Sequence, residues 1–151
     1  MWTAPLTVCM RDEQMIRLFG NAKDEDLSEE SFAGSLFFYP AFFDQISLEV
    51  INPHDRETGA GRVPVWLESV PAKAESVFKL PYVPLSETGS DDAKKDLELV
   101  ADSIWFMMTE YGFGAKVSSG FGTADILLDT VQVLPNKWKE IVRKRLKGED
   151  T

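Results

Sequence analysis

The stretch DDAKKDLELVADSIWFMMTEYGFGAKVSSGFG, residues 91–122, joins the strongest helical pattern in the chain to its densest group of glycines. Between residues 91 and 111, apolar residues recur every three or four positions, the spacing of one face of an α-helix. These residues are Leu97, Val100, Ala101, Ile104, Trp105, Met108 and Tyr111. The pattern predicts an amphipathic helix over 91–111, capped at Ser90 or Asp91 and ended by Gly112.

The residues before this helix alternate as β-strands do. Residues 45–51, QISLEVI, place Ile46, Leu48 and Val50 on one face of a strand. Comparable patterns predict strands over 35–42, 63–70, 76–84 and, after the glycines, 123–134. Residues 71–75, PAKAE, are short enough to predict a hairpin between the strands on either side of them. Residues 52–64 contain proline, glycine and charge, and they predict a loop.

Two further helices are predicted near the ends of the chain. The first covers residues 11–19 and is expected to end at Gly20 and Asn21. The second covers residues 136–147 and is strongly basic; it either faces phosphate or packs through its apolar residues. The resulting order, α–β–β–β–β–α–β–α, predicts a single α+β domain over residues 1–151. We expect an antiparallel sheet with helices packed on one face.

Charge and cysteine content exclude several classes of protein. The 151 residues include 25 acidic and 16 basic side chains, for a net charge of −9, so we do not expect a free-standing non-specific RNA binder. Any nucleic-acid surface is then local or completed by partner subunits. Residues 24–30, DEDLSEE, predict a solvated loop. Cys9 is the only cysteine, so a structural thiol in a reducing cytoplasm is expected. We expect neither a secretory signal nor a membrane helix.

Three stretches carry a resemblance to a known family. The first is LFG at 18–20 followed by GSLFFYPAFF at 34–43, and the second is INPHDRETGAGRVPVWLESVP at 51–71. The third is YGFGAKVSSGFGTA at 111–124. In this order and spacing they resemble the CRISPR-associated RAMP superfamily, whose glycine-rich loop has the pattern G-x-G-x-K-[ST]-x-x-G-x-G. Here Val117 follows the lysine, and Pro40 stands where the family has an aspartate.

The resemblance implies a fold and a function. RAMP proteins have ferredoxin-like, RRM-like folds and serve as backbone or cap subunits of type III effector complexes in antiviral defence, or as guide-RNA processing endoribonucleases. The implied partners are guide RNA (crRNA), target RNA and other RAMP subunits in the cytoplasm, without a membrane and without a cofactor. The chain resembles the C-terminal portion of a RAMP unit, because only residues 3–10 offer a strand before the first helix. The family's cleavage aspartate therefore has no counterpart.

The glycine-rich loop is the first candidate RNA-binding site. Glycines let a backbone approach a phosphate closely, and exposed N–H groups bind anions. Lysine adds a positive charge, and serine adds hydroxyl donors. The residues that we expect to contact RNA in this loop are Gly112, Gly114, Lys116, Ser118, Ser119, Gly120 and Gly122. The alternative is that the glycines only connect a helix to a strand.

The second candidate site is the loop that carries His54, Arg56 and Arg62. We expect these residues to contact RNA or a neighbouring subunit. His54 is the only histidine, so the usual two-histidine cleavage site is absent, and neither a catalytic residue nor a metal site is predicted. An endoribonuclease that uses His54 and a protein-only interaction module remain the alternative functions. The aromatic run Phe37, Phe38, Tyr39, Phe42 and Phe43 is expected to lie mostly in the core.

Overall fold

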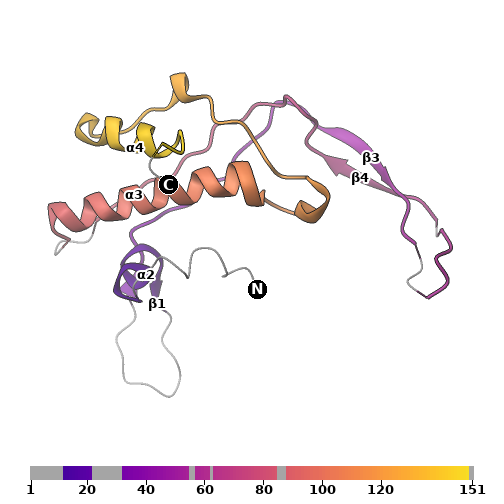
Figure 1. Cartoon of the computed structure of the whole chain (residues 1–151), viewed down its shortest axis with the longest axis horizontal. Helices are drawn as coiled ribbons and strands as arrows, with labels where there is room; N and C mark the ends of the chain where they lie inside the picture. Colours follow the sequence, from indigo (N-terminus) through magenta and orange to yellow (C-terminus); the bar gives the residue numbers. More distant parts are fainter. Residues whose placement is uncertain (1–11, 22–31, 55–56, 62, 85–87, 150–151) are drawn as a thin grey trace, which may run out of the picture. The chain divides into compact units, whose positions relative to one another are not determined.

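The computed structural model describes residues 12–21, 32–54, 57–61, 63–84 and 88–149 (Figure 1). It divides into two compact units, Met1–Ser35 with Val83–Thr151, and Leu36–Tyr82. The residues predicted to form a first strand (3–10), Cys9 and the acidic run 24–30 lie outside the described residues. Within the described ranges, no helix is long and apolar enough to cross a membrane.

The first unit is mainly helical. Its helices are α2 (Asp12–Phe19), α3 (Ser90–Phe106), the π-helix η1 (Met107–Tyr111), the 3₁₀ turns η2 (Val117–Ser119), η3 (Leu128–Thr130) and η4 (Asn136–Trp138), and α4 (Lys139–Arg145). The predicted helices over 11–19, 91–111 and 136–147 are thus confirmed. The start of α3 differs from the prediction, because Gly89 is its N-cap and no side chain caps it.

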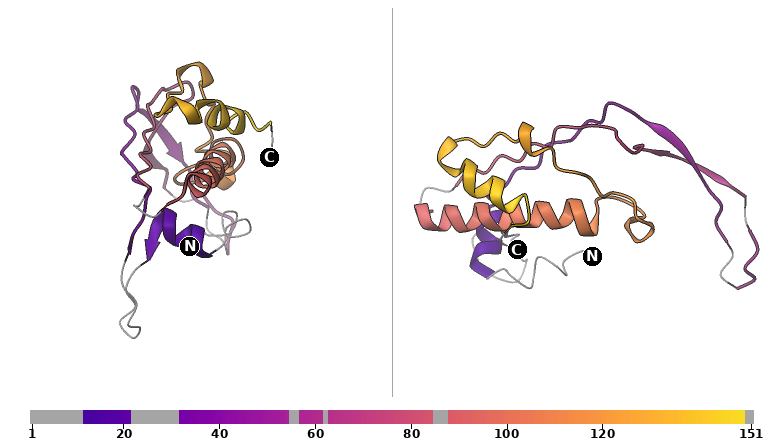
Figure 2. Two further views of the ribbon diagram at one scale, coloured as in Figure 1. Left: turned by 90° about the vertical axis from the view of Figure 1, so that its left-hand side faces the viewer. Right: turned by 45° about the horizontal axis from the view of Figure 1, so that its top comes forward.

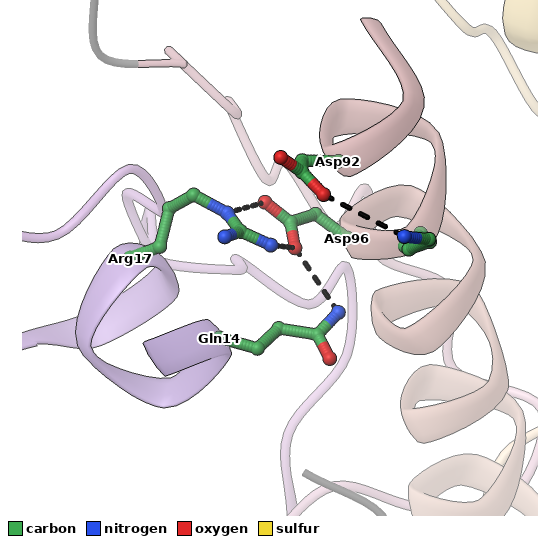
Figure 3. A network of polar contacts seen from close by, with 5 residues as sticks. Gln14, Arg17, Asp92 and Asp96 are labelled. Carbon is green, nitrogen blue, oxygen red and sulfur yellow. Dashed lines mark hydrogen bonds and ion pairs between the residues drawn. The ribbon is translucent and has the colours of Figure 1, made fainter. Parts of the chain in front are cut away.

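A buried ion pair joins α2 to α3 (Figure 3). Asp96 of α3 is fully buried, and its two carboxylate oxygens accept hydrogen bonds from Arg17 Nε at 2.7 Å and Nη2 at 2.6 Å. The Gln14 side-chain amide donates a third hydrogen bond to Oδ1 at 3.0 Å. The paired, bidentate geometry offsets the cost of burying the charge.

The chain passes very close to the end of α2. The two short strands β1 (Gly20–Asn21) and β2 (Phe32–Ala33) pair antiparallel beside it. At Gly34 a Cβ atom would lie only 2.4 Å from the Phe19 carbonyl carbon, so this position admits no side chain without a backbone shift. Leu18 is fully buried here. The close contact explains why the LFG turn and the later glycine occur together.

Helix α4 packs along α3 (Figure 2). Arg145 Nη1 lies 3.1 Å from Asp102 Oδ2, and Ala101 and Leu146 are the buried apolar residues near this contact. The basic helix was expected either to face phosphate or to pack through its apolar residues. Packing is favoured, because Trp138, Ile141 and Val142 are half-buried. The basic side chains in its last turn also lie where they complement the helix dipole.

The second unit is one long antiparallel hairpin (Figure 1). Strands β3 (Ser47–Ile51) and β4 (Val65–Ser69) pair from Ser47 opposite Ser69 to Ile51 opposite Val65. Isolated bridges extend the pairing in both directions: Leu36 with Tyr82, Phe43 with Ser76, and His54 with Gly61. The strands predicted over 45–51 and 63–70 are confirmed, and the α+β class with antiparallel pairing is confirmed with them.

The predicted hairpin across residues 71–75 is wrong. Residues 65–69 pair with 47–51, and residues 71–74 form a turn within the second side of the ribbon. In that turn the Ala74 N–H donates to the Pro71 carbonyl at 3.2 Å, and Lys73 has a positive φ of 71°. Turn-forming residues predict a reversal of the chain, but here they form an outward bulge, because the better partner strand lies further away in the sequence.

Two more expectations are corrected. Residues 123–134 do not form a strand: Thr130 donates to the Leu127 carbonyl through its N–H and its hydroxyl, and Arg143 donates to the Leu128 carbonyl. These contacts use backbone groups that a sheet would need. The aromatic run at 37–43 is not core either, because its five rings are exposed. A two-stranded ribbon has no second layer of its own to cover them.

Candidate nucleic-acid interface

The glycine loop begins at a change of helix type. In the last turn of the helix, the Gly112 N–H donates to the Met107 carbonyl, five residues earlier, at 2.8 Å. In an α-helix that N–H would bond to the Met108 carbonyl. The freed Met108 carbonyl instead accepts the Ala124 N–H at 2.9 Å, from the segment that leaves the loop. The π-turn therefore anchors both ends of the loop.

Two of the four glycines close the base of the loop. Phe113 N–H donates to the Gly122 carbonyl at 2.9 Å. A Cβ atom on Gly122 would lie 2.0 Å from the Phe113 carbonyl oxygen, and one on Gly112 would lie 2.7 Å from the Phe121 carbonyl oxygen. Both glycines also have positive φ angles. These two positions are thus explained by backbone packing alone, which is the connection role that the sequence left open.

The other two glycines belong to the open part of the loop. Gly114 and Gly120 have φ angles of 87° and 84°, and an added Cβ on either would meet nothing within 4 Å. Lys116 lies between them in the left-handed conformation, with φ 62°. The turn η2 follows, with the Ser119 N–H bonded to the Lys116 carbonyl and the Gly120 N–H to the Val117 carbonyl. The space on the Cβ side of Gly114 and Gly120 is therefore open.

This open part presents hydrogen-bond donors. Within the part of the chain that the structure describes, the backbone N–H groups of Gly114, Ala115 and Lys116 have no acceptor. The Lys116 side chain is exposed and makes no ion pair with the described residues. Ser118 and Ser119 are also exposed. Consecutive N–H groups around a left-handed residue, next to one cation, form a surface suited to a phosphate or another oxyanion.

A small hollow lies beside the base of the loop. It has a volume of about 250 Å³ and is lined by Met108, Thr109, Thr123, Ala124 and Asp125. The Thr109 hydroxyl already donates to the Trp105 carbonyl at 2.9 Å. Because the hollow is small and carries the Asp125 carboxylate, it does not extend the cationic surface. The candidate anion site is the loop itself.

The second candidate site lies in the hairpin unit. His54 is exposed and pairs with Gly61 near the hairpin tip, so the histidine belongs to the tip of a ribbon rather than to a pocket. Arg56 and Arg62 lie outside the described residues. In the turn between them, the Thr58 hydroxyl oxygen accepts the Ala60 N–H at 3.3 Å. The glycine loop belongs to the other unit, so the two candidate sites are separate structural features.

Across the described ranges, no three His, Cys, Asp or Glu side chains gather as metal ligands. What sequence reasoning missed is the role of Met108, whose backbone carbonyl holds the loop exit. The apolar spacing through Met108 gave no signal of this role, because that spacing records side chains and the contact is made by a backbone carbonyl.

Comparison with known proteins adds no identification. The sequence matches no protein-family model and none of the curated proteins.

Proposed function

We propose that the chain is a non-catalytic, RNA-binding subunit of a type III CRISPR effector complex, and that it holds guide RNA through the glycine-rich loop. The observation that carries the proposal is the open side of that loop. Three backbone N–H groups without acceptors among the described residues lie beside the exposed Lys116. RNA presents a phosphate at every nucleotide, and such donors bind phosphate without regard to base sequence.

The long hairpin supports a place in a multi-subunit complex. Most of its large apolar residues are exposed, among them Phe42, Ile46, Leu48, Trp66 and Val77. A single two-stranded ribbon is only marginally stable in water, and large exposed apolar surface is typical of protein interfaces. In our proposal neighbouring RAMP subunits cover this surface. In the same proposal, those subunits complete a ferredoxin-like sheet. The described residues form two separate two-stranded sheets.

Local binding also agrees with the charge of the chain. A net charge of −9 repels RNA over most of the surface, so the loop acts as a short contact within a complex rather than as a free RNA-binding protein. Guide RNA bound by several subunits would need only one or two phosphate contacts from each of them. Because the other subunits hold the RNA close to the loop, its effective concentration there is high, and a weak contact is enough for binding.

Lys116→Ala tests the proposed phosphate contact. We expect affinity for single-stranded RNA to fall about tenfold whatever its sequence, since one charge-assisted contact is lost. The slope of log affinity against log salt should fall by about one. Gly120→Val should reduce affinity further, because its φ of 84° disfavours a β-branched residue. The measurement is fluorescence anisotropy between about 50 and 200 mM salt, using the full-length chain with any subunits that co-purify.

The matched control for this change is Lys95→Ala. Lys95 is an exposed lysine of α3, so its removal changes net charge by the same amount away from the loop. We expect it to leave the salt slope close to that of the wild type. If Lys116→Ala has no more effect than Lys95→Ala, the loop does not bind phosphate, and the protein-only interaction module becomes the better explanation of the glycines.

The second expected outcome is that the chain does not cleave RNA. His54 is exposed at a hairpin tip, and no second histidine exists to act as its acid or base partner. Purified protein should leave guide-repeat RNA and target RNA intact on denaturing gels, with and without magnesium. Specific cuts that disappear in His54→Ala would overturn the binding-subunit proposal in favour of an endoribonuclease.

A further inference from the structure

The glycine loop contains the same tripeptide twice. Gly-Phe-Gly occupies residues 112–114 and again residues 120–122, at the two sides of the loop. Phe113 is 42% exposed and Phe121 is 38% exposed. Each phenylalanine thus stands between two glycines with positive φ angles. The phosphate-binding surface described above does not explain why both of these positions carry an aromatic ring.

The two phenylalanines lie on backbone segments that touch. The Phe113 N–H bonds to the Gly122 carbonyl, and the Phe121 carbonyl oxygen lies against Gly112. Both rings therefore start from the closed base of the loop, only a few residues from the unpaired N–H groups at its open side. A nucleotide whose phosphate lies on the open side has its base within reach of this region.

Neither ring is used in an aromatic contact within the described part of the chain. The nearby aromatic pairs are Trp105 with Phe106, at 4.9 Å between ring centroids, and Phe106 with Tyr111, at 6.4 Å. Phe113 and Phe121 take part in neither of these pairs. Gly122, which is bonded to Phe113 across the base, has no side chain to cover the Phe113 ring. Each of the two residues keeps more than a third of its surface accessible, beside the candidate anion site.

We propose that Phe113 and Phe121 stack on RNA bases, so that the loop takes single-stranded RNA with unpaired bases and not duplex RNA. This inference rests on the proposed function. Phosphate contacts alone do not distinguish a single strand from a duplex, because both present the same backbone groups. Stacking on an aromatic side chain requires a base that has left its own stack. The rings therefore make the loop prefer single-stranded RNA, which the phosphate contact alone does not do.

The test compares ring and charge variants on matched RNAs. The probes are a 12-nucleotide single-stranded RNA, the same strand in a duplex, and the same strand with abasic sites. Phe113→Leu and Phe121→Leu keep an apolar side chain but remove the π face. Each should lower affinity for the single strand about tenfold, near the lower end of the range for one stacked base, and leave the salt slope unchanged. The wild type should bind the duplex and the abasic strand more weakly than the intact strand.

The outcomes separate this inference from the proposed function. If Lys116→Ala lowers the salt slope but neither leucine variant changes affinity, the rings do not stack and the phosphate contact stands. Equal wild-type affinity for duplex and single strand would also overturn the inference. If Lys116→Ala has no effect either, the proposed function itself fails.

The variants Phe113→Trp and Phe121→Trp distinguish a loss of stacking from a folding defect. Each tryptophan should bind RNA, and its fluorescence should be quenched by the single strand but not by the abasic strand. Equal quenching by both strands would contradict stacking.

Discussion

Arg17→Met is expected to lower the free energy of unfolding by about 3–5 kcal/mol, the usual cost of removing one partner of a buried ion pair. Asp96 is fully buried, and Arg17 supplies two of the three hydrogen bonds that its carboxylate is seen to accept. Without the guanidinium, the buried carboxylate loses the cation that faces it. The loss should appear in urea denaturation followed by circular dichroism, as a lower midpoint.

Two further variants show whether burial is the reason. Lys94→Met removes the cation of an exposed pair with Glu98 at 3.8 Å, and we expect a change of less than about 0.5 kcal/mol. Combining Arg17→Met with Asp96→Leu removes the buried carboxylate as well, so most of the lost stability should return. If Arg17→Met costs no more than Lys94→Met, the ion pair does not hold α2 to α3.

Gly122→Ala is expected to have the second largest effect, at about 3 kcal/mol. The change combines two costs. An L-residue at a φ of 85° costs about 1–2 kcal/mol, and the added Cβ would lie 2.0 Å from the Phe113 carbonyl oxygen. Backbone must then move, at a further cost of about 1–3 kcal/mol. We also expect the bond from Phe113 to Gly122 to open, which hydrogen exchange of the Phe113 amide would report.

Gly120→Ala is the matched control for this change. Its φ of 84° imposes the same conformational cost, but its Cβ would meet nothing within 4 Å. The expected loss is about 1–2 kcal/mol, with the Phe113 amide still protected. Equal losses of stability for the two variants would show that conformational strain alone explains why both positions require glycine. The contact that closes the base of the loop would then carry little energy.

The local structure was largely predictable from the sequence. The apolar spacing over 91–111 places the helical residues correctly, with Gly112 as the stop, although it gave no sign that Met107–Tyr111 would be π-helical. Alternation over 45–51 and 63–70 places β3 and β4. The glycine loop was recognisable because few other residues tolerate positive φ. In each case the signal lies within one short segment, where local sterics and the side-chain period decide.

Strand pairing was not predictable in the same way. Residues 71–75 have the composition of a hairpin turn, yet β4 pairs with β3 and not with the strand candidate that follows the turn. Residues 123–134 alternate well enough for a strand, but Arg143 and local turns take their carbonyls. The aromatic run at 37–43 has a core composition but lies exposed. Alternation predicts that a strand can form, but it does not predict which strand will pair with it or which layer will cover it.

The sequence by itself determined the positions of α2, α3, α4, β3 and β4 and of the glycine loop, because those features depend mainly on neighbouring residues. Only the tertiary structure decided that Asp96 would be buried against Arg17 and that Gly112 and Gly122 close the loop while Gly114 and Gly120 stay open. It also decided that the Met108 carbonyl would hold the loop exit. Each of these depends on contacts between residues at least nine positions apart, which no local pattern of size, charge or polarity records.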